Sequence, residues 1–371
     1  MIPLAIAGAE MIGSVGPDLA NCCAAIRAGL IRSEAISHFS VLDEESQELT
    51  PLIGRPIQGF TEGFFVQGLW IRVGLACFQG LVRKESLPNG ADRRFWSATG
   101  LLAVTPPITD SRFECDASYT TQELKEAYLG RLIEFDTVPI SLENADVICI
   151  GHAGAIAAVE HAGMMITKMG LERVIILAVD SYLDSMTLDW LDVLGRLKTA
   201  ENPVGLIPGE AGACFMVESL AHYQVRSRTA HVVIQNAALD CEKDHYFSEK
   251  KTQGVALAKV ISRSLSESAV QTPFRGDVIS DLNGEEWRAY ELGCARVRVA
   301  GQLDPEARFM FPAASLGEVG CASGAVAICF AMRALERGYA RQDKVLVIST
   351  GDYGQVGAVL VSKYDGFSHN K

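Results

Sequence analysis

The chain has 371 residues, of which 49% are hydrophobic and 21% are charged, and this composition excludes an intrinsically disordered protein. Its 33 basic and 45 acidic residues give a formal charge of −12, which excludes sequence-independent binding to DNA or RNA because such binding needs clustered cations. At about 150 residues per domain, the length predicts two domains or one large α/β unit built of two halves.

The ten cysteines follow no disulfide or metal-binding pattern, since the chain has no CxxC motif and no Cys/His pair at zinc spacing. We therefore expect reduced thiols, a cytoplasmic location, no metal and no cofactor. The longest apolar runs are shorter than the ~20 residues that span a membrane, so no membrane partner is expected. The opening residues 1–10 lack the basic region of a signal peptide and are predicted to form a buried strand.

The first part of the chain has the pattern of an α/β unit. The apolar residues 2–8 predict a strand, and residues 18–28 predict an amphipathic helix that Gly29 ends as its C-cap. Further on, the pattern predicts a buried helix over 69–82 and a strand over 95–104, which Pro106 and Pro107 end. The polar, proline-containing segments 40–60 and 105–125 are predicted to be loops or lids.

A βαβ element is predicted over residues 145–180. Its parts are a buried strand over 146–150, a tight turn over 151–154, a helix rich in small residues over 155–169 and a second buried strand over 173–179. Another strand is predicted over 212–218. Because the strand at 146–150 is apolar on both faces, both of its faces must be covered.

The second part repeats this plan of strands and small-residue helices. Strands are predicted over 231–236, 277–280, 344–349 and 357–363, and helices over 254–266, 286–296 and 325–337. We expect Trp287 and Arg288 to anchor the helix that begins near 286. Polar residues cluster between 219 and 230, so the predicted halves are residues 1–225 and 226–371.

Several motifs in a fixed order give the chain a family resemblance. They are Ala7-Gly8 with Gly13, the sequence Arg27-Ala28-Gly29, the turn and helix at 151–162, Asn202-Pro203 with 208–212, and the segments 280–291, 315–324 and 349–357. In this order they resemble the thiolase superfamily, and within it the β-ketoacyl synthase branch, over nearly the whole chain. The resemblance implies an α/β fold with five layers (αβαβα) in two pseudo-repeated halves, and a homodimer formed through the N-terminal half.

The catalytic positions of that family hold different residues here. The resemblance places His152 at the position of the nucleophilic cysteine, and Asp281 and Glu318 at the positions of the two catalytic histidines. An imidazole cannot form the usual thioester, and an acyl-imidazole would be labile. Ionised carboxylates cannot donate hydrogen bonds to an enolate, and they would repel a malonyl carboxylate. We therefore do not expect Claisen condensation.

His152, Asp281 and Glu318 leave three interpretations open. They could fill a decayed site and bond to one another. They could form new acid/base machinery, with His152 oriented by one of the carboxylates. One histidine with two carboxylates is also a known metal-ligand set.

The resemblance also implies a substrate pocket, for which we expect Gly151, Asn283, Cys321, Gly351, Tyr353 and Gly354. Cys321 has two interpretations of its own. It precedes an apolar helix whose dipole would favour a thiolate. It is equally a small residue that could be buried in a Cys-Ala-Ser-Gly turn.

The first functional hypothesis is a non-condensing β-ketoacyl synthase homologue that acts as a partner, scaffold or specificity subunit and retains an acyl pocket. Chain-length-factor subunits of related families lack the cysteine and pair with an active synthase. The alternative is an acyltransferase, hydrolase or decarboxylase of acyl thioesters that uses His152 with Asp281 and Glu318. A third hypothesis is an adaptor or chaperone in a larger assembly.

The expected partners follow from these hypotheses. They are a second copy of the chain, an active synthase or other protein, and an acyl-CoA or acyl carrier. Since acyl carriers are themselves acidic, the charge of −12 suits them poorly.

Overall fold

The computed structural model describes residues 2–43, 47–108, 111–113, 118–135, 139–226, 232–268 and 270–364. Two halves of five strands each form its framework. The first half contributes β1 (Leu4–Gly13), β4 (Thr99–Val104), β5 (Ala145–Ile148), β6 (Arg173–Ser181) and β7 (Glu210–Ser219). The second contributes β8 (Val232–Cys241), β9 (Asp277–Ser280), β10 (Arg308–Met310), β11 (Lys344–Thr350) and β12 (Gln355–Lys363).

The two halves have the same strand order. Along the first the order is β1-β7-β6-β4-β5, and along the second it is β8-β12-β11-β9-β10. Corresponding pairs also run in the same directions, with the first two pairs of each half antiparallel and the last two parallel. A short antiparallel pairing of Leu4 with Ile234 and Ala5 with Val233 joins the halves. The pseudo-repeat expected from the sequence is therefore present in the topology.

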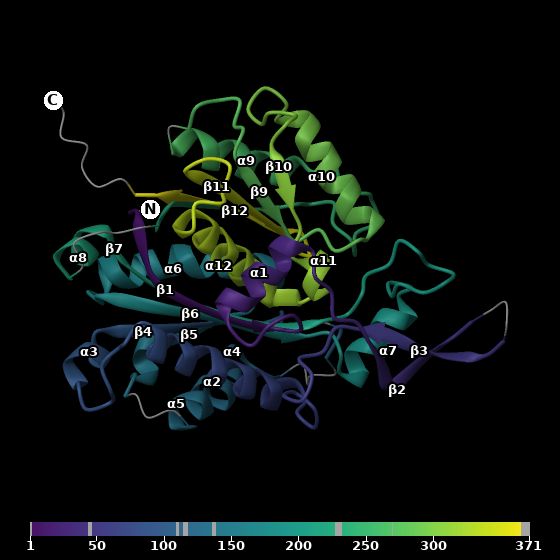
Figure 1. The fold of residues 1–371 in the computed structure, drawn as a ribbon, viewed down its shortest axis with the longest axis horizontal. Helices are drawn as coiled ribbons and strands as arrows, with labels where there is room; N and C mark the ends of the chain where they lie inside the picture. Colours follow the sequence, from purple (N-terminus) through teal and green to yellow (C-terminus); the bar gives the residue numbers. More distant parts are fainter. Residues whose placement is uncertain are drawn as a thin grey trace.

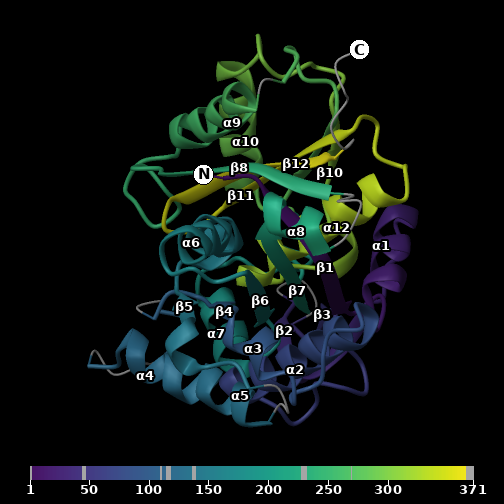
Figure 2. The same cartoon turned by 90° about the vertical axis from the view of Figure 1, so that its left-hand side faces the viewer.

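Helices cover both faces of each set of strands, which gives five layers (Figure 1). In the outer layers, α2 (Val66–Lys84) packs on β1, β6 and β7, and α9 (Val255–Glu267) packs on β8 and β12 with α10 (Glu286–Arg298) beside it. The middle layer holds α1 (Leu19–Ala28), α6 (Gly154–Lys168) and α12 (Ser323–Glu336). The turned view shows α6 and α12 between the strands of the two halves (Figure 2).

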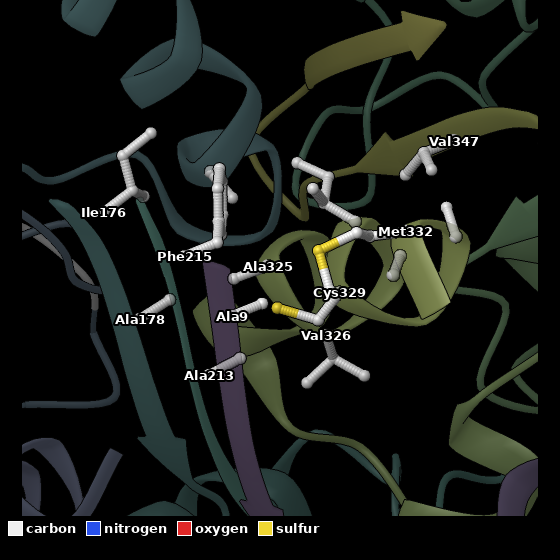
Figure 3. Close-up of a cluster of buried hydrophobic side chains, with 14 of the residues drawn as sticks. Ala9, Ile176, Ala178, Ala213, Phe215, Ala325, Val326, Cys329, Met332 and Val347 are labelled. Carbon is white, nitrogen blue, oxygen red and sulfur yellow. The ribbon is translucent and has the colours of Figure 1, made fainter. Parts of the chain in front are cut away.

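Small side chains allow the middle layer to pack closely on both sheets. On α12, Ala325, Val326, Cys329 and Met332 lie in one buried cluster with Ala9, Ala213 and Phe215 of the first half and Val347 of the second (Figure 3). At the start of α6, a Cβ on Gly154 would overlap Cγ1 of Val104. Close packing of this kind is what an interior at crystal-like density requires.

The remaining elements are short. The helices are α3 (Arg93–Ser97), α4 (Thr121–Lys125), α5 (Arg131–Phe135), α7 (Ser185–Val193), α8 (Leu220–Arg226) and α11 (Ala313–Leu316). Single turns are η1 (Glu126–Gly130), η2 (Leu142–Asn144), η3 (Gly151–Ala153) and η4 (Gly320–Ala322). Strands β2 (Glu34–Leu42) and β3 (Leu49–Gly54) form a separate hairpin that extends from the body (Figure 1).

Several predicted boundaries are wrong. Residues 95–97 belong to helix α3, which Asp92 caps, so the predicted strand over 95–104 begins only at Thr99. The segment 40–60, predicted as a loop, holds β3 and the end of β2. The first strand continues past its predicted end to Gly13.

Two predictions fall partly outside the described residues. In the predicted loop 105–125, residues 109–110 and 114–117 are not described, and helix α4 begins at Thr121. The predicted boundary at 219–230 falls on α8 and on residues 227–230, which are not described. Within the described part of the chain, every helix is too short or too polar to cross a membrane.

Candidate functional site

Two equivalent turns carry the key side chains, one in each half. Turn η3 holds His152 just before α6, and turn η4 holds Cys321 just before α12. In both turns the leading glycine has a left-handed backbone, with φ of 69° at Gly151 and 50° at Gly320. His152 and Cys321 are thus corresponding positions of the pseudo-repeat, a relationship that sequence reasoning missed although both turns have the pattern Gly-X-Ala.

His152 belongs to a closed ring of seven buried or half-buried side chains. His152 Nε2 lies 3.0 Å from Glu318 Oε1, and Asn283 Nδ2 donates to Glu318 Oε2 at 2.5 Å and to Glu285 Oε2 at 2.9 Å. Arg196 then donates to both oxygens of Glu285, at 2.7 and 2.8 Å.

The other side of the ring returns through Asp352. Arg196 Nη1 donates to Asp352 Oδ2 at 2.7 Å, and Arg288 Nη2 donates to Asp352 Oδ1 at 2.8 Å. The same Arg288 Nη2 lies 3.0 Å from His152 Nε2, which closes the ring. His152 and Arg196 come from the first half and the other five residues from the second, so the ring links the two halves.

Charge balance indicates that the His152 imidazole is protonated. The ring holds three carboxylates, Glu285, Glu318 and Asp352, against two guanidinium groups, so it is neutral when the imidazole is protonated. Burial and the Arg288 charge lower the pKa of His152, but Glu318 outweighs them and the net pKa is raised above its ordinary value. Burial raises the pKa of Glu318, but the imidazolium lowers it to about 2. We infer that Nε2–H donates to Glu318 and that Arg288 is only a close neighbour.

Asp281 lies outside this ring. Its Oδ2 accepts hydrogen bonds from Ser349 Oγ at 2.6 Å and from Thr350 N at 2.8 Å, and it lies 3.6 Å from Arg288 Nη1. Of the two carboxylates that could orient His152, Glu318 is the one that contacts it, whereas Asp281 is bound to the end of β11. In the described part of the chain, no cluster of His, Cys, Asp and Glu side chains is placed to hold a metal ion.

Cys321 is a buried structural thiol. Its side chain donates to the carbonyl oxygens of Val104 and Val179, both at 3.4 Å, while its backbone N–H donates to Asp180 Oδ2 at 3.0 Å. Burial and the Asp180 charge raise the pKa of the Cys321 thiol well above its usual range. The buried-turn interpretation of Cys321 fits this environment, and the thiolate interpretation does not.

The cavity beside His152 has a volume of about 20 Å³, which is room for about one water molecule. Of the residues expected in a substrate pocket, Gly151, Cys321, Gly351 and Tyr353 line this cavity. Asn283 belongs to the ring instead, and Gly354 closes the turn between β11 and β12 by donating to Gly351 O at 3.0 Å. An acyl chain does not fit next to His152 in this conformation.

A segment of the predicted loop 105–125 covers this cavity. Pro106, Pro107 and Arg112 line it, and the fully buried Arg112 donates to Asp180 Oδ1 at 2.8 Å and to Thr187 Oγ1 at 2.7 Å. Pro106 and Pro107 also line an apolar cavity of about 180 Å³ on their other side, together with Trp70, Phe113 and Met186. The two prolines therefore lie between the narrow cavity beside His152 and the larger apolar cavity.

Four residues of the ring were not predicted at the site. Arg196, Glu285 and Asp352 carried no pattern that distinguishes them from surface charges, and Arg288 was expected only to anchor its helix. All four are buried. The one signal available for Asp352 was its place between Gly351 and Tyr353, both of which were expected at the pocket.

The sequence matches no protein-family model and no curated protein. Its fold, in contrast, matches solved structures over nearly the whole chain. One is a chain of a complex described as a type II polyketide synthase acyl-carrier protein with its ketosynthase bound to the hexaketide (TM-score 0.75, 12% identity, 98% of this chain and 100% of that chain). Another is the ishigamide ketosynthase/chain length factor (TM-score 0.68, 16% identity, 98% of this chain and 99% of that chain).

A third match is an oxazolomycin ketosynthase domain from Streptomyces albus JA3453 (TM-score 0.73, 13% identity, 100% of this chain and 76% of that chain). The chain therefore has the thiolase-like fold of ketosynthases, as the sequence motifs predicted. At such low identity, the likeness shows the fold and leaves the chemistry to be argued from the site.

Proposed function

We propose that this chain is a non-condensing homologue of β-ketoacyl synthases that acts as a partner, scaffold or specificity subunit. The observation that carries the proposal is the closed ring around His152. In a condensing enzyme, the corresponding position must present a free thiolate to an acyl thioester. Here it holds an imidazole whose Nε2 is bonded to Glu318 and lies close to the Arg288 guanidinium.

The surroundings of the ring support the same proposal. Condensation needs room for an acyl chain and a malonyl group, whereas the cavity beside His152 has about 20 Å³. Each charged group of the ring already has an oppositely charged partner, so binding a substrate carboxylate there would require breaking buried ion pairs.

The apolar cavity of about 180 Å³ is our candidate for a retained acyl pocket. Its walls include Trp70, Phe113 and Met186, and Pro106 and Pro107 separate it from His152. An acyl chain bound in this cavity would be held apart from His152 and would not react, which is what a specificity subunit needs. Bound apolar ligands are recognised mainly by such hydrophobic walls.

Strand β5 is our candidate for the contact with a second subunit. It lies at one end of the strand order and pairs only with β4 within the described chain. Its sequence Ala145-Asp-Val-Ile148 is largely apolar, and an open strand edge offers backbone groups to another chain. The partner is either a second copy of this chain or an active synthase, and the solved complexes named above include assemblies of ketosynthases with other subunits.

The absence of condensation can be tested directly. The protein is incubated with acyl-CoA and acyl-carrier thioesters plus malonyl thioester, followed by intact-mass measurement and product analysis. We expect neither a covalent adduct nor a 3-ketoacyl product, both for the natural chain and for His152→Cys, because the carboxylates of Glu285, Glu318 and Asp352 remain beside that position. A condensation product from the natural chain would overturn the proposal.

The assembly can be tested by light scattering coupled to size exclusion. We expect a dimer, and we expect Ile148→Lys on β5 to shift it toward monomer while Phe135→Lys, at an exposed position of α5, leaves it unchanged. A monomer in which Ile148→Lys changes nothing would remove β5 as the contact.

A second candidate function is acid/base chemistry on acyl thioesters, and the 3.0 Å contact between His152 and Glu318 favours it. The raised pKa of His152 suits a general acid rather than a base. Thioester turnover that is lost in His152→Ala and reduced in Glu318→Gln would support this candidate. If both variants turn over thioesters as fast as the natural chain, this second candidate function is wrong.

A further inference from the structure

A third cavity, larger than the one beside His152, lies where segments of the two halves meet. It has a volume of about 340 Å³ and shares no lining residue with the cavity beside His152. Its walls come from three segments that are distant in the sequence, residues 195–205, residues 245–252 and the first turns of α10. This volume lies in the range of small-molecule binding sites.

Aromatic side chains form one side of this cavity. Trp287 and Tyr290 lie three residues apart on α10 and so share a face of the helix, and Tyr246 adds a third ring from the neighbouring loop. The Trp287 and Tyr246 ring centroids are 5.4 Å apart. Tyr290 is 46% exposed, so its ring is available to a ligand. Such walls favour a flat ligand that can stack on them.

Two ring nitrogens at the cavity have no hydrogen-bond partner among the described residues. They are Trp287 Nε1 and His245 Nδ1, and both atoms are buried. A buried donor without a partner is unfavourable, so a ligand that supplies an acceptor would bind more tightly. Because an indole nitrogen only donates, the matching ligand atom is an oxygen acceptor.

The charges of the cavity are balanced. On its floor, Arg196 and Glu285 neutralise each other through two hydrogen bonds. Among the other lining residues, Lys250 and Lys251 are matched by Glu249 and Glu286. The lining residues therefore carry no net charge, and a neutral ligand avoids the cost of desolvating a charge.

We propose that this cavity binds a neutral, planar aromatic or conjugated molecule that carries carbonyl or hydroxyl oxygens. The ligand lies against Tyr290 and Trp287, and one of its oxygens accepts a hydrogen bond from a nitrogen of the cavity wall. Since the Arg196–Glu285 pair of the floor belongs to the ring around His152, a bound ligand also stabilises the ring. The site is independent of condensation, so it can exist whether or not the proposed function holds.

The test uses chromone and flavone as neutral planar carbonyl probes, with 2-decanone as a non-planar carbonyl control and naphthalene-2-sulfonate as a planar anion. Binding is measured by calorimetric titration of the full chain, supported by thermal unfolding. We expect saturable one-to-one binding of chromone or flavone, and at least ~10-fold weaker binding of both controls.

Variants locate the binding. Tyr290→Ala changes an exposed residue and should weaken binding about 10-fold without unfolding the chain, and Trp287→Phe should weaken it about 3-fold because the N–H is lost while a ring remains. Phe135→Ala, which removes an exposed ring in the other half, should bind like the natural chain. The proposal is overturned if neither probe saturates up to about 1 mM, if 2-decanone or the sulfonate binds as tightly, or if Tyr290→Ala binds like Phe135→Ala.

Discussion

Arg196 Nη1 donates to Asp352 Oδ2 at 2.7 Å, although the two residues lie 156 positions apart and belong to different halves of the chain. With its other nitrogens Arg196 holds Glu285, so one guanidinium joins both sides of the ring. Ion pairs of this kind add little net stability when intact, because both charges have lost their water. Removing one partner, however, leaves a charge buried without compensation. Because the ring links the two halves, a single substitution in it should lower the stability of the contact between them.

The first prediction concerns the contact between His152 and Glu318. Glu318→Gln should lower the free energy of unfolding by about 3–5 kcal/mol, because the imidazolium loses its buried counter-charge. His152→Ala combined with Glu318→Gln should cost clearly less than the sum of the two single losses. Urea unfolding of the four proteins measures this.

The exposed pair Arg263–Glu267 is the matched control for this cycle, with side chains 54% and 45% exposed. Arg263→Ala should cost less than about 1 kcal/mol. Strict additivity of the His152 and Glu318 substitutions would show that the two side chains are not coupled.

The second prediction is the pH range over which this pair stabilises the fold. The pKa of His152 is raised above 6.5, so its contribution is full below pH 6.5 and is lost as the pH rises through the folded pKa. The pKa of Glu318 is lowered from 4.5 to about 2, so its contribution is full above pH 4.5 and is lost as the pH falls toward 2. The difference in unfolding free energy between the natural chain and the double variant should peak between pH 4.5 and 6.5. A difference that is constant from pH 3 to 9 would contradict these shifts.

The third prediction concerns Glu291, which is buried and whose Oε2 has no hydrogen-bond partner among the described residues. Burial raises its pKa from 4.5 to about 7, outweighing the hydrogen bond from Thr252. Stability from this group is therefore full below pH 4.5 and is lost as the pH rises to about 7. Glu291→Gln removes that loss and should raise the unfolding free energy at pH 8 by up to about 3 kcal/mol.

At pH 4.5, in contrast, Glu291→Gln should change the unfolding free energy little, because the buried Glu291 carboxyl is then uncharged, as glutamine is. Exposed Glu286 of the same helix serves as control, and Glu286→Gln should change stability by less than about 0.5 kcal/mol at either pH. Thermal unfolding at the two pH values separates these outcomes. An equal effect of Glu291→Gln at both would show that the carboxyl is not shifted.

The fourth prediction concerns Gly320, which has a left-handed backbone in the turn η4. A Cβ there would overlap Asp180 Oδ2, whose carboxylate holds both Arg112 and the backbone N–H of Cys321. Gly320→Ala should cost at least about 2 kcal/mol from strain and displacement. Gly293→Ala, in α10 with open space around it, should instead stabilise by about 0.5–1 kcal/mol. Equal effects of the two substitutions would count against the geometry of η4.

The fifth prediction concerns thiol reactivity. Cys321 is buried, its Sγ donates to two carbonyls and its pKa is raised, so it should not react with iodoacetamide in the folded protein at pH 8. Exposed Cys241 should react readily under the same conditions. Peptide mapping by mass spectrometry measures both, and denaturant should make Cys321 react as fast as Cys241. Rapid labelling of Cys321 in the folded chain would revive the thiolate interpretation.

Much of the fold could be predicted because its signals are local. The apolar runs at 146–150, 173–179 and 344–349 are strands in the structure or overlap them, and the small-residue helices lie in the middle layer where two sheets need close packing. The hairpin of β2 and β3 was missed because its strands are half-polar and pack on few core residues. Helix α3 was missed because Phe95 and Trp96 favour a strand, while Asp92 caps a helix there.

By itself, the sequence predicted the two-half α/β plan and the order of motifs, and its resemblance to a known family pointed to His152 and Glu318. Only the tertiary structure decided which side chains those residues contact. The partners of His152 lie 136 and 166 positions away, so their pairing depends on how two halves meet. The buried Glu318 then sets the protonation of the imidazole, and the size of the remaining cavity sets what can approach it. Neither quantity exists until the chain has folded, because both depend on atoms that are distant in the sequence.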